Sequence, residues 1–207
     1  MKYAFLSLIS LMIVSILNGQ LTSDNIGFSR NGTSYSPFKG RFNAVALFPD
    51  GRILAGGEID GPGKDADFTL IAYNSQGIRD KSFGKDGIVQ TAIENYNDRL
   101  TSLLMLPDGK FIAAGSVSPY GKSTIGAMVK YLTNGAPDPG FGTNGIVRIP
   151  AGKQSVTIEA ITQQKDGKIL LTGTITGGMD NRLVVYRFLS NGLPDPAFGI
   201  KGAVELP

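Results

Sequence analysis

The sequence contains three near-copies of one stretch: AVALFPDGRILAGG, SLLMLPDGKFIAAG and AITQQKDGKILLTG. One glycine in each copy marks the period, and these glycines, Gly51, Gly109 and Gly167, are spaced 58 residues apart both times. Turn residues that return at a fixed interval are the signature of a repeated supersecondary unit whose copies stack on one another. The chain is therefore expected to fold as an array of three similar units.

Each copy predicts four short β-strands, because brief alternating apolar runs are separated by turns rich in Gly and Pro. In the first copy we expect them at Val45–Leu47, Ile53–Ala55, Phe68–Tyr73 and Ile88–Thr91. No stretch keeps a 3.6-residue apolar period between capping residues, so little helix is expected. Four strands in a unit of this length favour the blade of a β-propeller, and the fold class is predicted to be all-β.

The turn between the first two strands of each unit reads Pro-Asp-Gly twice and Lys-Asp-Gly once. In a three-residue hairpin loop, Asp accepts local backbone hydrogen bonds and Gly takes the left-handed position. These residues are therefore predicted to shape the turn and not to form a catalytic ring of carboxylates. They are Asp50, Gly51, Asp108, Gly109, Asp166 and Gly167.

A second repeated phrase follows the third strand and reads PDPGFGTNGIV in the second copy and PDPAFGIKGAV in the third. Its Phe is the one large apolar group in this corner, so we expect the ring to fill the seam between neighbouring units. The Asp three residues earlier is expected to accept hydrogen bonds from backbone N–H groups of the corner. The residues assigned in this way are Asp80, Phe83, Gly84, Asp138, Phe141, Gly142, Asp195, Phe198 and Gly199.

The repeats resemble the delta-sixty repeat of secreted bacterial proteins, a β-propeller repeat of uncharacterised role. The likeness is carried by residues 107–115, 131–147 and 188–204, and it extends over roughly residues 40–206. The chain departs from the pattern at Lys165, where the turn usually has Pro. The resemblance implies a propeller fold and export from the cell, and it implies no catalytic residue.

Residues 1–19 are predicted to be a signal peptide, because Lys2 precedes an apolar stretch, Tyr3–Leu17, that is short for a membrane span. An uncleaved anchor is the alternative. The predicted location is therefore extracellular or at the cell surface. We expect one β-repeat domain, 20–207, made of an N-terminal segment with a degenerate corner, 20–40, and three repeats, 41–93, 98–151 and 156–206.

Composition limits the chemistry that this chain can perform. There is no Cys and no His, which excludes disulfides, a lipid-anchoring Cys and imidazole catalysis. The 20 basic and 17 acidic residues give a net charge of +3, which provides no electrostatic surface typical of nucleic-acid or anionic-membrane binding. We expect no cofactor, no nucleic-acid partner and no stable membrane span.

Two groups of acids outside these turns are candidate sites. Asp60, Asp65 and Asp67 lie in the loop DGPGKDAD, where oxygen ligands could hold Ca²⁺, although the spacing matches no EF-hand and a solvated loop is the default. Glu58 and Glu159 are the acids best suited to a glycosidase-type pair, but nothing in the sequence pairs them.

The favoured hypothesis is a secreted, non-enzymatic β-repeat protein that binds a partner or acts as a surface scaffold through its loops. Carbohydrate or protein ligands are candidates, since Tyr35, Tyr96 and Tyr120 stand in loops. The alternatives are a propeller hydrolase or lyase that acts on extracellular polysaccharide through loop carboxylates, and a truncated propeller without an independent role.

The number of repeats poses a separate question, because closed propellers have about four to eight blades. Three arrangements stay open. The chain is a truncated relative of a longer propeller, or two chains complete a six-blade ring, or the units form an open array.

Overall fold

The computed structural model shows an all-β chain of twelve strands in three four-stranded antiparallel sheets. The structure describes residues 40–60, 66–94, 97–150, 152–178 and 180–206, and these contain no helix. The predicted signal peptide lies outside the described residues, and so does the N-terminal segment with the degenerate corner, 20–40, apart from Gly40.

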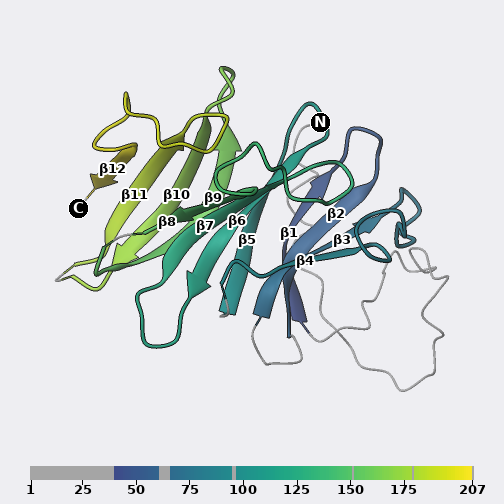
Figure 1. The fold of residues 1–207 in the computed structure, drawn as a ribbon, viewed down its shortest axis with the longest axis horizontal. Coiled ribbons are helices and arrows are strands. Elements are labelled where there is room, and N and C mark those ends of the chain that lie inside the picture. Colours follow the sequence, from purple (N-terminus) through teal and green to yellow (C-terminus); the bar gives the residue numbers. More distant parts are fainter. Residues whose placement is uncertain (1–39, 61–65, 95–96, 151, 179, 207) are drawn as a thin grey trace, which may run out of the picture.

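Each repeat forms one sheet, with its strands side by side in chain order (Figure 1). The first sheet contains β1 (Gly40–Leu47), β2 (Ile53–Asp60), β3 (Ala66–Tyr73) and β4 (Ile88–Thr91). The second sheet contains β5 (Asn97–Met105), β6 (Phe111–Ser118), β7 (Ile125–Tyr131) and β8 (Ile146–Ile149). The third sheet contains β9 (Ser155–Gln163), β10 (Ile169–Thr176), β11 (Arg182–Phe188) and β12 (Ala203–Leu206).

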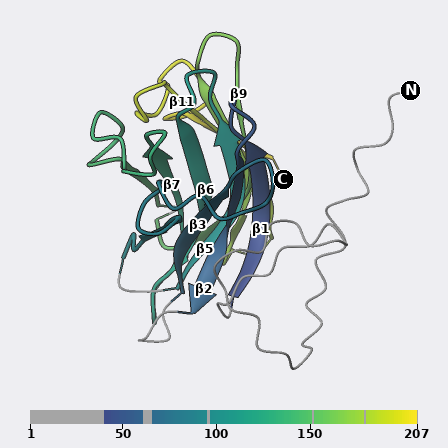
Figure 2. The ribbon, with the colours of Figure 1, turned by 90° about the vertical axis from the view of Figure 1, so that its right-hand side faces the viewer.

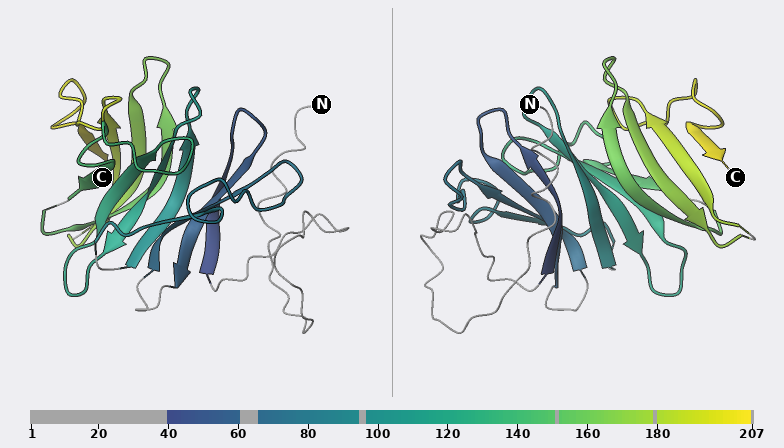
Figure 3. Two further views of the ribbon diagram at one scale, coloured as in Figure 1. Left: turned by 45° about the vertical axis from the view of Figure 1, so that its right-hand side comes forward. Right: turned by 180° about the vertical axis from the view of Figure 1, so that it is seen from behind.

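The three sheets lie next to one another in a fan, with the second sheet in the middle (Figures 1 and 2). The innermost strands β1, β5 and β9 are neighbours along the fan. The view from behind in Figure 3 shows that the first and third sheets do not meet. The fold of the described residues is therefore an incomplete β-propeller that is not closed into a ring.

The core consists of two seams between adjacent sheets. Ala113 and Val129 of the second sheet face the first sheet, whereas Ile112 and Met128 face the third. Because both of its faces are covered, β6 is buried from Phe111 to Val117. Burying one such apolar side chain contributes about 1.5–3 kcal/mol, so these two seams supply most of the driving force for folding.

A β-bulge interrupts each innermost strand, at Asn43, Thr101 and Glu159. The first two of these side chains reach the next sheet. Asn43 Nδ2 donates a hydrogen bond to the Leu100 carbonyl (2.8 Å), and Thr101 Oγ1 donates one to the Ile158 carbonyl (2.7 Å). The bulges at Asn43 and Thr101 thus tie neighbouring sheets together. The apolar alternation of the sequence did not predict the bulges.

A tight two-residue turn leads into the fourth strand of every sheet. Its first residue is Asp86, Asn144 or Lys201, with φ of 52°, 54° and 53°, and its second is a Gly with positive φ. Two consecutive left-handed residues define a type I′ turn, which favours Asn or Asp followed by Gly. Lys201 is therefore the least suited residue at this position.

The replacement Lys201→Asn is expected to stabilise the protein by ~0.5–1 kcal/mol, because Asn tolerates the left-handed conformation better than Lys. The reciprocal change, Asn144→Lys, should destabilise it by a similar amount. Urea unfolding of both variants checks this, and equal midpoints for the two variants would contradict the assignment of the turn.

Candidate functional site

The β1–β2 turn and its equivalents hold their Asp residues in one repeated geometry. The Oδ1 atoms of Asp50, Asp108 and Asp166 accept the backbone N–H two residues later, at 3.0, 3.1 and 3.2 Å. The Gly that follows each Asp has a φ near +80°, from 79° at Gly109 to 86° at Gly51. These three carboxylates therefore stabilise separate turns, and they do not converge on a common site.

The corner Asp residues are also bound within their own units. The Oδ1 atoms of Asp80, Asp138 and Asp195 accept the N–H two residues on, at 3.0, 3.1 and 3.0 Å. Their Oδ2 atoms take a basic partner. These pairs are Arg52 Nη1 with Asp80 (3.0 Å), Lys110 Nζ with Asp138 (3.0 Å) and Arg187 Nε with Asp195 (2.8 Å).

In the first two units, the basic partner comes from the residue directly after the turn between the first two strands, and in the third unit Lys168 at this position lies 3.9 Å from Asp195 in addition to Arg187. Each of these ion pairs therefore connects that turn to the corner, and both lie at the end of the sheets that we call the corner end. Sequence reasoning missed this link, although the basic residue after Asp-Gly in all three copies was a signal for it.

These contacts keep the corner acids ionised. The hydrogen bond from Lys110 lowers the pKa of Asp138 below its ordinary value. Burial opposes ionisation of Asp80, but hydrogen bonds from Ser82 and Arg52 outweigh it and lower its pKa. A general acid needs a raised pKa instead, so these carboxylates have the properties of structural anchors.

The corner Phe residues differ in what covers them. Phe83 and Phe141 are 0% and 1% exposed. A Cβ added at Gly135 would lie 2.9 Å from the Phe83 ring, and one at Gly192 would lie 3.0 Å from the Phe141 ring. Each ring therefore packs on a turn of the following sheet.

A backbone hydrogen bond accompanies each of these two rings. The Gly84 N–H donates to the Asn134 carbonyl (3.0 Å), and the Gly142 N–H donates to the Asn191 carbonyl (2.9 Å). Phe198 is only half-buried, because no sheet follows it among the described residues. The Arg187 guanidinium lies 4.4 Å above its ring.

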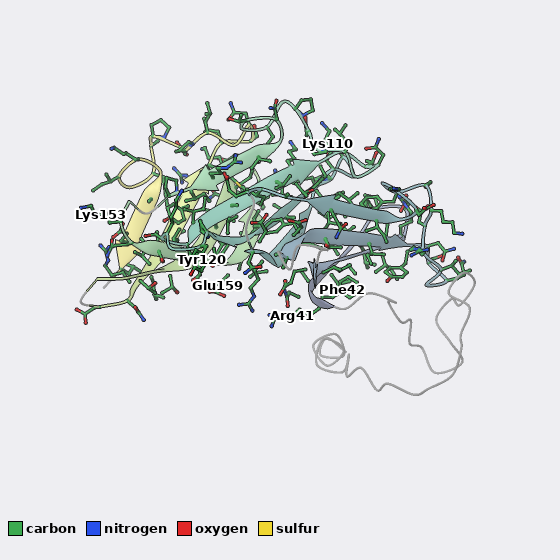
Figure 4. The ribbon with its side chains drawn as sticks, turned by 60° about the horizontal axis from the view of Figure 1, so that its bottom comes forward. Arg41, Phe42, Lys110, Tyr120, Lys153 and Glu159 are labelled. Atoms are coloured by element: carbon green, nitrogen blue, oxygen red, sulfur yellow. The ribbon has the colours of Figure 1, made fainter. Side chains whose placement is uncertain are left out.

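The two glutamates considered as a catalytic pair have unlike surroundings. Glu58 is buried and accepts hydrogen bonds from Arg41 Nε and Asn43 Nδ2, both at 2.6 Å. Glu159 is exposed at the β9 bulge and has no hydrogen-bond partner in the described part of the chain. In Figure 4, Glu159 lies on β9 of the third sheet, whereas Arg41 and Phe42 lie on β1 of the first sheet.

The loop acids considered for Ca²⁺ are only partly described. Asp65 lies outside the described residues, as does the side chain of Asp60, while Asp67 is half-buried in β3. Among the residues that are described, no group of three or more acidic side chains could hold a metal ion.

Asp98 is a buried acid that sequence reasoning missed. It is 0% exposed near the start of β5, where its Oδ2 accepts the Ile93 N–H (2.7 Å) and its Oδ1 has no partner in the described residues. Burial raises the pKa of Asp98 to about 7, and the charges of Asp67 and Glu94 add to this effect. The signal was an acid at an apolar-facing position where the other repeats have Gly40 and Val156.

A shallow cavity of about 610 Å³ opens at the outer edge of the first sheet. It is lined by the corner and fourth strand, and the charged side chains around it are Arg79, Lys85 and Asp86. With a single acid among its charged side chains, the cavity provides no pair of carboxylates for glycoside chemistry.

The opposite end of the sheets carries the loop at residues 119–124, and we call it the loop end. Tyr120 at its tip is 96% exposed. Ser123 Oγ donates to the Lys153 carbonyl (2.9 Å), and the Thr124 N–H donates to Ser155 Oγ (3.0 Å). The loop is therefore held against the third sheet while its aromatic ring faces solvent (Figure 4). Tyr35 and Tyr96 lie outside the described residues.

The sheets and their repeated corners define a propeller-type repeat domain. A family model described as a β-propeller domain of unknown function (DUF5122) matches residues 106–141 and 164–198. Both matched segments begin at a turn between the first two strands of a unit and end at the corner Phe. A search of curated proteins found no match to this chain. In the described ranges, no helix has the length and apolar character needed to cross a membrane.

We expect Asp98 to make the protein less stable as the pH rises from about 4 to about 7. Its folded-state pKa of about 7 exceeds the ordinary 3.8, so the folded state binds this proton more tightly than the unfolded state does. The stability that the bound proton provides is complete below about pH 4 and falls by up to ~1.4 kcal/mol per pH unit above it.

The variant Asp98→Asn should lack this decline, as measured by urea unfolding at several pH values between 4 and 8. Asp138→Asn serves as the control. The pKa of Asp138 is lowered from its ordinary 3.8, so the stability that this acid provides is lost only below about pH 4, and the variant should keep the decline between pH 4 and 8. Parallel pH profiles of the wild type and Asp98→Asn would refute the assignment.

Proposed function

We propose that this chain is an exported, non-enzymatic binding or scaffold protein that contacts its partner through the loop end. The observation that carries the proposal is Tyr120, an aromatic side chain that is 96% exposed on a loop fixed by hydrogen bonds. Leaving a large aromatic ring in water is unfavourable, and such rings are typical of binding surfaces because one part is apolar and the hydroxyl is polar.

Carbohydrate is the ligand class that suits this surface best. A flat ring can stack on the apolar C–H face of a sugar, and the neighbouring exposed Lys122 offers its ammonium group to sugar oxygens. The corner acids are engaged in their own turns and ion pairs, which favours binding over hydrolysis.

Export is part of the proposal because of the apolar N-terminal stretch and the likeness to secreted repeats. The absence of Cys is compatible with an oxidising compartment, where free thiols would be reactive. Fractionation of the native host into cytoplasm, envelope and medium tests this part, and recovery in the cytoplasm alone would refute it.

The binding role is tested on a glycan array with the wild type and Tyr120→Ala. We expect specific glycan signals that fall at least tenfold in the variant, because stacking of the Tyr120 ring on a sugar would supply much of the affinity of a shallow site. Leu193→Ala is the matched control, since Leu193 is also exposed (56%) but lies in a turn at the corner end. No glycan signal above background, or equal loss in both variants, would contradict carbohydrate binding at Tyr120.

A further inference from the structure

We propose that two copies of this chain associate head to tail and close a six-sheet ring. In this ring the opening face, the side of the first sheet that carries Val45 and Leu47, packs on the closing face of the other copy. The closing face is the side of the third sheet that carries Thr172, Leu183 and Leu206. The two internal seams of the chain provide the template. In each seam, the side of one sheet that corresponds to the closing face packs on the side of the following sheet that corresponds to the opening face.

Exposed apolar side chains mark both faces. Val45 and Leu47 are 57% and 62% exposed, whereas their equivalents in the second sheet, Leu103 and Met105, pack in the seam with the first sheet. The opening face thus repeats a surface that is covered inside the chain.

The closing face shows the same contrast. Leu183 and Leu206 are 59% and 50% exposed. Ile149, which stands in the second sheet where Leu206 stands in the third, is only 5% exposed because the third sheet covers it. Both unpaired faces therefore have the side chains of a seam but no neighbour in the described structure.

The seams also predict which residues would meet. A Cβ at Gly56 would lie 3.0 Å from Leu103 and 3.1 Å from Leu100 of the next sheet. The equivalent of Gly56 in the third sheet is Thr172, so its expected neighbours in the second copy are Val45 and Phe42.

A second contact follows in the same way. A Cβ at Gly126 would lie 2.8 Å from Ile158 of the third sheet. Leu183 replaces Gly126 in the third repeat, and the counterpart of Ile158 is Phe42, which is half-buried in β1. An apolar side chain on the closing face would therefore pack on an aromatic ring of the opening face.

Backbone groups match as well. Gly84 and Gly142 donate their N–H groups across the two internal seams to Asn134 and Asn191. The Gly199 N–H, which occupies the same position in the third corner, has no acceptor in the described residues. Its counterpart would be the carbonyl of Gln76 in the second copy, which likewise accepts no hydrogen bond from a described group.

The third bulge position differs from the other two. Asn43 and Thr101 donate hydrogen bonds to carbonyls of the next sheet, whereas Glu159 places a carboxylate, which only accepts, at the third bulge. In the second copy it would lie near the Phe42 carbonyl, directly after Arg41. The Arg41 side chain is 66% exposed and its Nε pairs with Glu58 (2.6 Å), so its Nη groups are the donors that would meet Glu159 in this register.

A head-to-tail contact generates a ring when its rotation closes, and otherwise an open filament. Two copies give two identical interfaces and six sheets, which lies within the range of about four to eight blades known for closed propellers. Ring closure also covers the exposed apolar side chains of both faces at once. Left uncovered, these side chains would promote aggregation.

The test is the mass of the purified chain in solution, measured by light scattering after gel filtration. We expect a dimer for the wild type and a twofold lower mass for both Val45→Asp and Leu183→Asp. Both side chains are exposed in one chain, so circular dichroism should show an unchanged β-sheet signal. Tyr120→Asp is the control, because Tyr120 is 96% exposed away from both faces and this variant should stay dimeric.

Mixing the two monomeric variants adds a second readout. Each variant keeps one intact face, so an equimolar mixture should form a heterodimer through one unaltered interface, whereas neither variant dimerises alone. A monomeric wild type, a series of larger open polymers, or a dimer that both substitutions leave intact would each overturn the proposal.

Discussion

The fold depends on the packing of one aromatic ring against one glycine at each seam. Phe83 and Phe141 leave the corner of one sheet and pack on Gly135 and Gly192 of the next, where a single Cβ would fall within about 3 Å of the ring. Removing such a ring costs about 3–5 kcal/mol, whereas a partly exposed ion pair such as Lys110–Asp138 contributes ~0.2–1 kcal/mol. The seams therefore hold the sheets together, and the turns and ion pairs position the rings.

The residues shared by the three repeats explain the structure that the three sheets have in common. Positions where one repeat differs from the others therefore show what is particular to that sheet. Asp98 puts a carboxylate where the other units have Gly40 and Val156, so its burial raises its pKa and makes stability depend on pH. Phe198 and Glu159 occupy standard seam positions, but no sheet follows them in the described structure. The same positions that stabilise the interior thus become an exposed surface at the end of the fan.

The period of the sequence was sufficient to predict three four-stranded units, since Gly and Asp at fixed turn positions act locally. The four strands of each unit were predicted, but several were placed too short, because β1 begins at Gly40 and β2 continues to Asp60 beyond the clear apolar alternation. The bulges at Asn43 and Thr101 were not predicted, because they depend on contacts with another sheet. The surroundings of Asp98 and Glu58 escaped prediction for the same reason, since burial arises only when the sheets pack.

The most direct test of the seams is native-state hydrogen exchange at the Gly84 and Gly142 amides, which donate across them to Asn134 and Asn191. If ring packing joins the sheets into one cooperative unit, both amides should exchange only when the whole domain unfolds, as slowly as the amides of the buried strand β6. Exchange at the rate of an exposed turn, with β6 still protected, would show that the sheets separate independently and would contradict the account.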